Sequence, residues 1–150
     1  MQLSLQEWAR VAESPVIVFV LVAYADGTLS EEERATFFTK WRPRLENVSV
    51  AHEAFKPAYL AGLEKATESL RPYTLQSAKA LLKRLADTFA MMRGRVRDSR
   101  VDNFRNTLMV LASDVAQASG GFSFIIDATS HVEEEAIEKL RRAMDGEASS

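Results

Sequence analysis

The feature that most constrains the fold is an apolar run of ten residues, VIVFVLVAYA, from Val16 to Ala25. A membrane-spanning helix needs about 20 such residues, so we expect this run in the core and expect no direct membrane insertion. Its β-branched residues would also suit a strand, but the chain has no second strand-like run of comparable strength to pair with it. A helix that is apolar on all faces belongs at the centre of a bundle. The run therefore predicts a buried central helix.

Helical periodicity continues on both sides of this run. Leu5, Trp8 and Ala12 recur at helical spacing and predict a first amphipathic helix. We expect Ser14-Pro15 to end it, with Ser14 capping a new helix and Pro15 as its first residue. A further helix is expected from its cap at Ser30 to Pro43. One long or two shorter helices are expected between 47 and 70, with Pro57 as the break, and three more over about 74–92, 100–119 and 132–144. The helix over 74–92 would be amphipathic, with an apolar side made of Leu75, Ala78, Leu82, Leu85 and Phe89.

These segments predict an all-α fold: one domain over residues 1–146, a bundle of about seven helices, with a frayed tail at 147–150. The chain has no cysteine, which excludes disulfides, thiolate zinc sites and cysteine nucleophiles. Its start lacks the basic and apolar regions of a signal peptide. We therefore expect a cytoplasmic protein.

A six-residue motif near the end of one predicted helix recurs in the second half of the chain. VAYADG at 22–27 returns as VAQASG at 115–120, and each copy precedes an acidic helix start, SEEE at 30–33 and SHVEEE at 130–135. The recurrence of this motif predicts two similar halves, about 1–70 and 74–146. The alternative is that capping chemistry alone makes two unrelated helix–turn–helix units look alike.

The stretch VAYADGTLSEEE resembles the signature of the TerB-like family, which comprises tellurite-resistance protein B and related helical domains. The matching residues are Ala25, Asp26, Gly27, Leu29 and Glu33 in the first half, and Ala118, Gly120 and one of Glu133 to Glu135 in the second. The second half departs from the pattern, because Ser119 stands where the family usually has Asp and the turn is about seven residues longer. The resemblance implies an all-helical fold of two halves, a bacterial stress or tellurite-resistance context, and acids at the two turns that bind a divalent metal.

The acids at these turns allow more than one interpretation. An EF-hand is excluded, because aligning Gly27 with the loop glycine puts Val22 and Tyr24 where the loop needs oxygen ligands. A looser divalent-cation site could form if the two turns met in space, and its ligands would be Asp26, Glu33, Asp127, His131 and Glu134. The alternative is structural: Asp26 shapes a turn, and the glutamates favour helix N-termini by about 0.3–1 kcal/mol each.

An arginine-rich segment is the second candidate site. Arg93, Arg95, Arg97 and Arg100 fall within eight residues, with Arg105 nearby, and guanidinium groups can pair with phosphate. Two aspartates, at 98 and 102, offset this charge, no aromatic residues interleave for base stacking, and the whole chain carries a net charge of −2. We therefore expect a solvated loop between helices, or one that docks an acidic partner, and no binding of nucleic acid.

Nothing in the sequence indicates catalysis. His52 and His131 lack a Ser nucleophile in a recognised arrangement, and Gly120-Gly121 lacks the lysine of a phosphate loop. The sequence and the resemblance together predict a non-enzymatic accessory domain that binds a protein partner, with a divalent cation as its only candidate cofactor. The alternative is a carboxylate- or metal-dependent hydrolase, which would need a deep pocket lined by at least two acids.

Overall fold

The computed structural model of the chain describes residues 3–24, 31–47, 56–119 and 131–146. These residues form seven helices and no strand: α1 (Leu5–Ala23), α2 (Glu31–Glu46), α3 (Lys56–Glu68), α4 (Arg71–Thr74), α5 (Ala78–Arg93), α6 (Asp98–Ser119) and α7 (His131–Asp145). The all-α prediction is confirmed, whereas the two similar halves stay a prediction. No described helix is long and apolar enough to cross a membrane.

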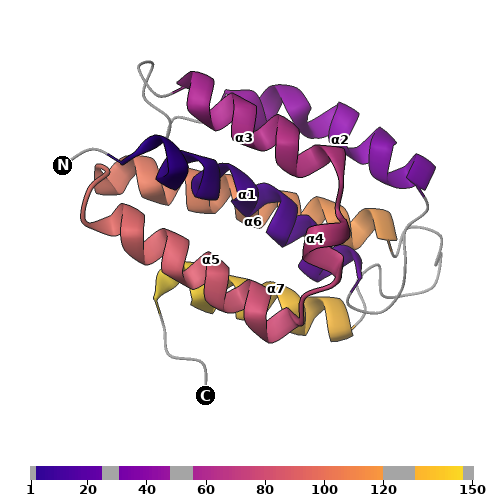
Figure 1. The fold of residues 1–150 in the computed structure, drawn as a ribbon. Helices are drawn as coiled ribbons and strands as arrows, with labels where there is room; N and C mark the ends of the chain where they lie inside the picture. Colours follow the sequence, from indigo (N-terminus) through magenta and orange to yellow (C-terminus); the bar gives the residue numbers. More distant parts are fainter. Residues whose placement is uncertain (1–2, 25–30, 48–55, 120–130, 147–150) are drawn as a thin grey trace.

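Helix α1 is the centre of the bundle, as the apolar run predicted. It contacts α3, α4, α5, α6 and α7 (Figure 1), and every residue from Ser14 to Ala23 is buried. Because its neighbours cover it on all sides, a helix without a polar face is stable there.

The predicted break at Ser14-Pro15 is wrong, because α1 runs through it without interruption. The helix starts instead at a capping box, in which the Ser4 hydroxyl accepts from the Glu7 N–H at 3.2 Å and the Glu7 carboxylate accepts from the Ser4 N–H at 2.8 Å. Proline in a helix interior costs about 3 kcal/mol, and the burial of the apolar residues around Pro15 offsets that loss. The Ser14 hydroxyl is fully buried and has no hydrogen-bond partner among the described residues.

Two other prolines, Pro43 and Pro57, lie inside helices. Helix α2 passes through Pro43 and ends at Glu46, so the predicted stop there is wrong. Pro57 is the second residue of α3, a position in the first turn where the missing N–H has no intrahelical partner to lose.

The helix predicted over about 74–92 forms as α5, but it starts four residues later than expected. Helix α4 ends at Thr74, and α5 begins at Ala78, where the Ser77 hydroxyl caps it by accepting from the Ala80 N–H at 3.1 Å. The buried residues of α5 are Leu81, Leu85, Thr88, Phe89 and Met92. The predicted apolar side is therefore wrong at its start: Leu75 and Ala78 do not belong to the buried face of α5, since both are exposed and Leu75 is 73% exposed.

Two kinds of contact hold the outer helices to the centre. The Trp41 indole N–H of α2 donates to Asp114 of α6 at 2.9 Å, and the Phe19 and Phe38 rings of α1 and α2 lie 4.7 Å apart. Helix α3 approaches α1 closely at Gly62, where a Cβ atom would lie 3.0 Å from the Ala9 Cα. Helices α2 and α3 thus both pack directly on α1.

Candidate functional site

A half-open pocket lies where α1 ends, between α4, α5 and α7. Its volume is about 360 Å³, within the range typical of binding sites. The described residues that line it are Val20, Leu21, Tyr24, Thr74, Gln76, Ala78, Leu81, Leu82, Glu135, Ala136 and Lys139. We call it the end pocket.

The end pocket has an apolar floor and a polar rim. Val20 and Leu21 of α1 and Leu81 of α5 belong to the buried core, so the floor is a continuation of that core toward solvent. Glu135 and Lys139 lie one helical turn apart on α7, both lining the pocket. Neither forms an ion pair or hydrogen bond with another described residue. The pocket can therefore take an apolar group and present a charge of each sign at its edge.

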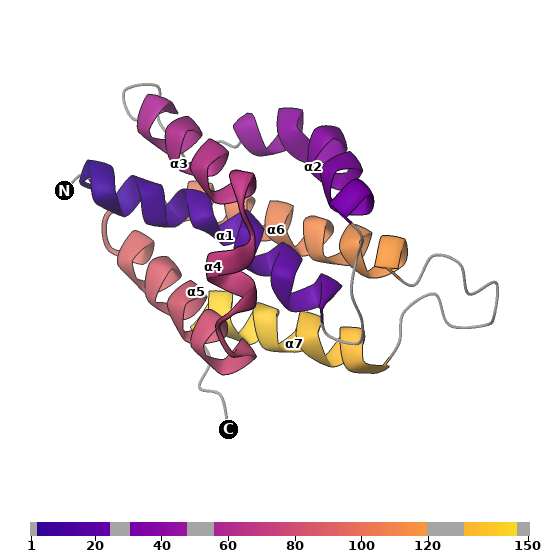
Figure 2. The ribbon, with the colours of Figure 1, turned by 45° about the vertical axis from the view of Figure 1, so that its right-hand side comes forward.

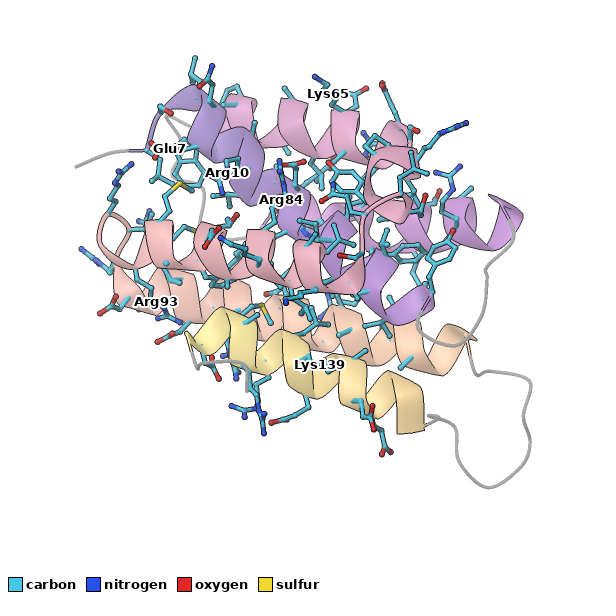
Figure 3. The ribbon with its side chains drawn as sticks, turned by 60° about the horizontal axis from the view of Figure 1, so that its bottom comes forward. Glu7, Arg10, Lys65, Arg84, Arg93 and Lys139 are labelled. Atoms are coloured by element: carbon cyan, nitrogen blue, oxygen red, sulfur yellow. The ribbon has the colours of Figure 1, made fainter. Side chains whose placement is uncertain are left out.

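A clamp of three side chains joins α1, α4 and α5, three of the helices that also line the end pocket. The Glu13 carboxylate of α1 accepts from the Tyr73 hydroxyl of α4 and from Arg84 of α5, each at 2.6 Å, and Arg84 reaches toward α1 (Figure 3). Burial, and then the hydrogen bond to Glu13, raise the pKa of Tyr73, which keeps its hydroxyl a donor. No local sequence pattern predicts this clamp, because Tyr73 and Arg84 follow Glu13 by 60 and 71 residues.

The five predicted metal ligands are only partly placed. Asp26 and Asp127 lie outside the described residues; Glu33 and His131 belong to α2 and α7, but their side chains are not among those described. Glu134 is exposed in the first turn of α7. Among the described side chains, no group of three or more acids and histidines could hold a metal ion. The metal site therefore stays a prediction.

The structure does place the helix ends on either side of the two predicted metal-binding segments. The last turns of α1 and α6 and the first turns of α2 and α7 lie at the same end of the bundle (Figure 2). Residues 25–30 and 120–130 connect these ends, and both acidic helix starts follow them. The end pocket opens beside this end, because its α1 and α7 lining residues come from the last turn of α1 and the second and third turns of α7.

The arginine-rich segment pairs largely with carboxylates of the same chain. Arg93 contacts Asp102 at 2.7 Å, and Arg95 reaches Glu7 on α1; Figure 3 marks Glu7 and Arg93. Arg105 binds Asp145 at the end of α7 at 2.9 Å, and this contact lowers the pKa of Asp145. These pairs support the interpretation as a structural loop between α5 and α6, while the absence of nucleic-acid binding stays a prediction.

A second pocket of about 290 Å³ lies between α2 and α3. Its two arginines already have contacts within the chain, since Arg34 donates to the Thr67 carbonyl at 3.4 Å and Arg42 pairs with Glu46 at 3.0 Å. Among the described residues, each of the two pockets has one carboxylate, Glu135 in the first and Glu68 in the second. The two-acid pocket that the hydrolase alternative requires is not found among these residues.

Comparison with known proteins adds no relative: no family model, no curated protein and no solved structure matches the chain.

Proposed function

We propose that this chain is a non-enzymatic interaction domain, similar in kind to TerB-like domains, that binds a protein partner at the end pocket. The observation that carries the proposal is the pocket itself: its floor is apolar core, and its rim carries Glu135 and Lys139 without partners among the described residues. Apolar pockets with a few polar groups at the edge are typical of recognition sites.

The geometry favours binding over chemistry. General acid–base catalysis needs at least one titratable group whose pKa suits the reaction, and hydrolysis of the type considered needs a second acid nearby. The described lining of the end pocket offers one exposed carboxylate, Glu135. Its apolar floor instead suits the burial of a partner's apolar side chain, and the bonds of Glu13 to Tyr73 and Arg84 hold together three of the helices around it.

The proposal is tested with a photo-crosslinking amino acid placed at single positions in cells that express the chain. Gln76 lines the end pocket, and Lys65 on α3 is an exposed control position outside it. We expect discrete protein adducts from Gln76 and none from Lys65. Equal labelling from both positions, or no adduct from Gln76, would refute the proposed binding surface.

The bacterial stress or tellurite-resistance context and the divalent cation belong to the same proposal. They are supported by the resemblance of VAYADGTLSEEE and by the common location of the ends of α1, α2, α6 and α7. Calorimetry with Ca²⁺, Mg²⁺, Mn²⁺ and Zn²⁺ tests the cation. We expect binding to the wild type that Asp26→Ala weakens. Absence of heat in both proteins would remove the metal and leave the interaction domain.

A further inference from the structure

We infer that the partner of the end pocket is a second copy of this chain, so that two molecules form a two-fold symmetric dimer across α4 and α7. This inference rests on the proposed function, because it names the partner that the pocket takes. Three features support it: an exposed leucine whose two chain neighbours line the pocket, the apolar pocket itself, and a pair of opposite charges on α7.

Leu75 provides the group that would enter the pocket. It lies between Thr74 and Gln76, which both line the end pocket, and it is itself 73% exposed. It is the most exposed large apolar side chain among the described residues. A protruding leucine next to an apolar hollow is an unfavourable surface for a lone molecule, and a second molecule removes both features from water at once.

In a dimer with a two-fold axis, each copy can insert its Leu75 into the pocket of the other. In a symmetric dimer, residue i of one copy contacts residue j of the other, and j contacts i in return. Leu75 of each copy can then enter the end pocket of its partner, and the pocket volume exceeds that of one leucine side chain. The same surface patch thus supplies both the protruding group and the pocket that receives it.

The same two-fold symmetry would bring opposite charges on the two α7 helices together. Glu135 and Lys139 lie one turn apart on α7, line the same pocket and have no partner among the described residues. Two antiparallel α7 helices across the axis would place each Glu135 against the Lys139 of the other copy. An unrelated partner would need matching charges of its own, whereas a second copy supplies both. The net charge of −2 is small enough not to oppose self-association.

The test measures the mass of the purified full chain in solution, by sedimentation equilibrium over a wide concentration range. We expect a reversible rise from 16.8 kDa toward twice that mass. Leu75→Ser should raise the dimer dissociation constant on the order of a hundredfold or more, because two leucines are lost from each dimer. Leu5→Ser is the matched control: Leu5 is 69% exposed at the opposite end of α1, and its replacement should leave the dimer intact.

Charge reversal separates this dimer from non-specific association. Glu135→Lys and Lys139→Glu should each weaken the dimer, and the double variant E135K/K139E should restore it, because the swap recreates both opposite-charge pairs. Circular dichroism checks that every variant remains helical. A wild type that stays at 16.8 kDa throughout, an unchanged Leu75→Ser dimer, or a double variant no better than the single ones would each overturn the inference.

The same experiments separate this inference from the proposed function. Adducts from Gln76 to a different protein, with a monomeric purified chain, would overturn the dimer and keep the interaction domain. Absence of any adduct in cells would instead count against the proposed function.

Discussion

Gly62→Ala tests the close packing of α3 on α1. A Cβ atom at position 62 would lie 3.0 Å from the Ala9 Cα and 3.1 Å from the Ala12 Cβ. Both are atoms of a central helix and cannot rotate away as the end of a long side chain would. Overpacking of this kind costs typically 1–3 kcal/mol, whereas replacing glycine by alanine in a helix gains about 1 kcal/mol. Since the clash involves backbone, we expect the cost to prevail and the variant to lose about 1–2 kcal/mol.

Urea unfolding followed by circular dichroism measures this loss. For a chain of this length, 1 kcal/mol corresponds to a fall in Tm of about 2–4 °C, so thermal unfolding should show a fall of several degrees. Gly94→Ala is the matched control, because no atom lies within 4 Å of its Cβ position and its φ of −97° suits any residue. We expect the control to change stability by less than about 0.5 kcal/mol.

A Gly62→Ala variant as stable as the wild type, or more stable, would contradict this prediction. That result would mean that helix propensity dominates and that α1 and α3 can separate without loss. Gly62→Val is a second test of the same contact. Because valine is larger than alanine, it should lower the unfolding free energy further than Gly62→Ala does.

Three further predictions concern buried and paired polar groups. Tyr73→Phe removes the 2.6 Å hydrogen bond to Glu13, so it should lower the unfolding free energy by about 1–2 kcal/mol in urea titration; no loss would show that the clamp is not stabilising. Asp145 has a pKa held below its ordinary value, chiefly by the hydrogen bond from Arg105. Its contribution is therefore fully present above the ordinary aspartate pKa and is lost as pH falls through that value toward the folded-state pKa. Asp145→Asn should flatten the acid decline of urea midpoints measured from neutral pH to pH about 3; an unchanged slope would contradict this. Ser14→Ala removes a buried hydroxyl without a described partner, so differential scanning calorimetry should show equal or higher stability, by up to about 1 kcal/mol, and a clear loss would mean that the hydroxyl is satisfied.

Part of the candidate site could be anticipated from the sequence. The acidic start of α7 was recognised from its run of glutamates, and one of them, Glu135, lines the end pocket. The sequence does not predict the pocket residues Lys139 and Gln76 or the Glu13 clamp, because none of them stands in a motif. The five proposed metal ligands rested on a family resemblance and a turn pattern, and of their side chains the structure describes only Glu134.

Local chemistry determined the type and the place of most helices. The helix expected over about 100–119 forms as Asp98–Ser119, and the one over 132–144 forms as His131–Asp145. Both depend on apolar residues at helical spacing and on residues near their ends, signals that lie within a few positions of each other. The burial of the apolar run in α1 followed from its composition alone, since no surface position tolerates it.

Tertiary structure decided what local signals left open. Local propensity favours a break at Pro15, yet the energy of burying α1 on all sides carries the helix through it. Periodicity likewise favours burial of Leu75, but the Ser77 cap starts α5 after it and leaves it exposed. The end pocket arises only where α1, α4, α5 and α7 meet. Its chemistry depends on distances between residues far apart in the chain, which packing sets and sequence spacing does not.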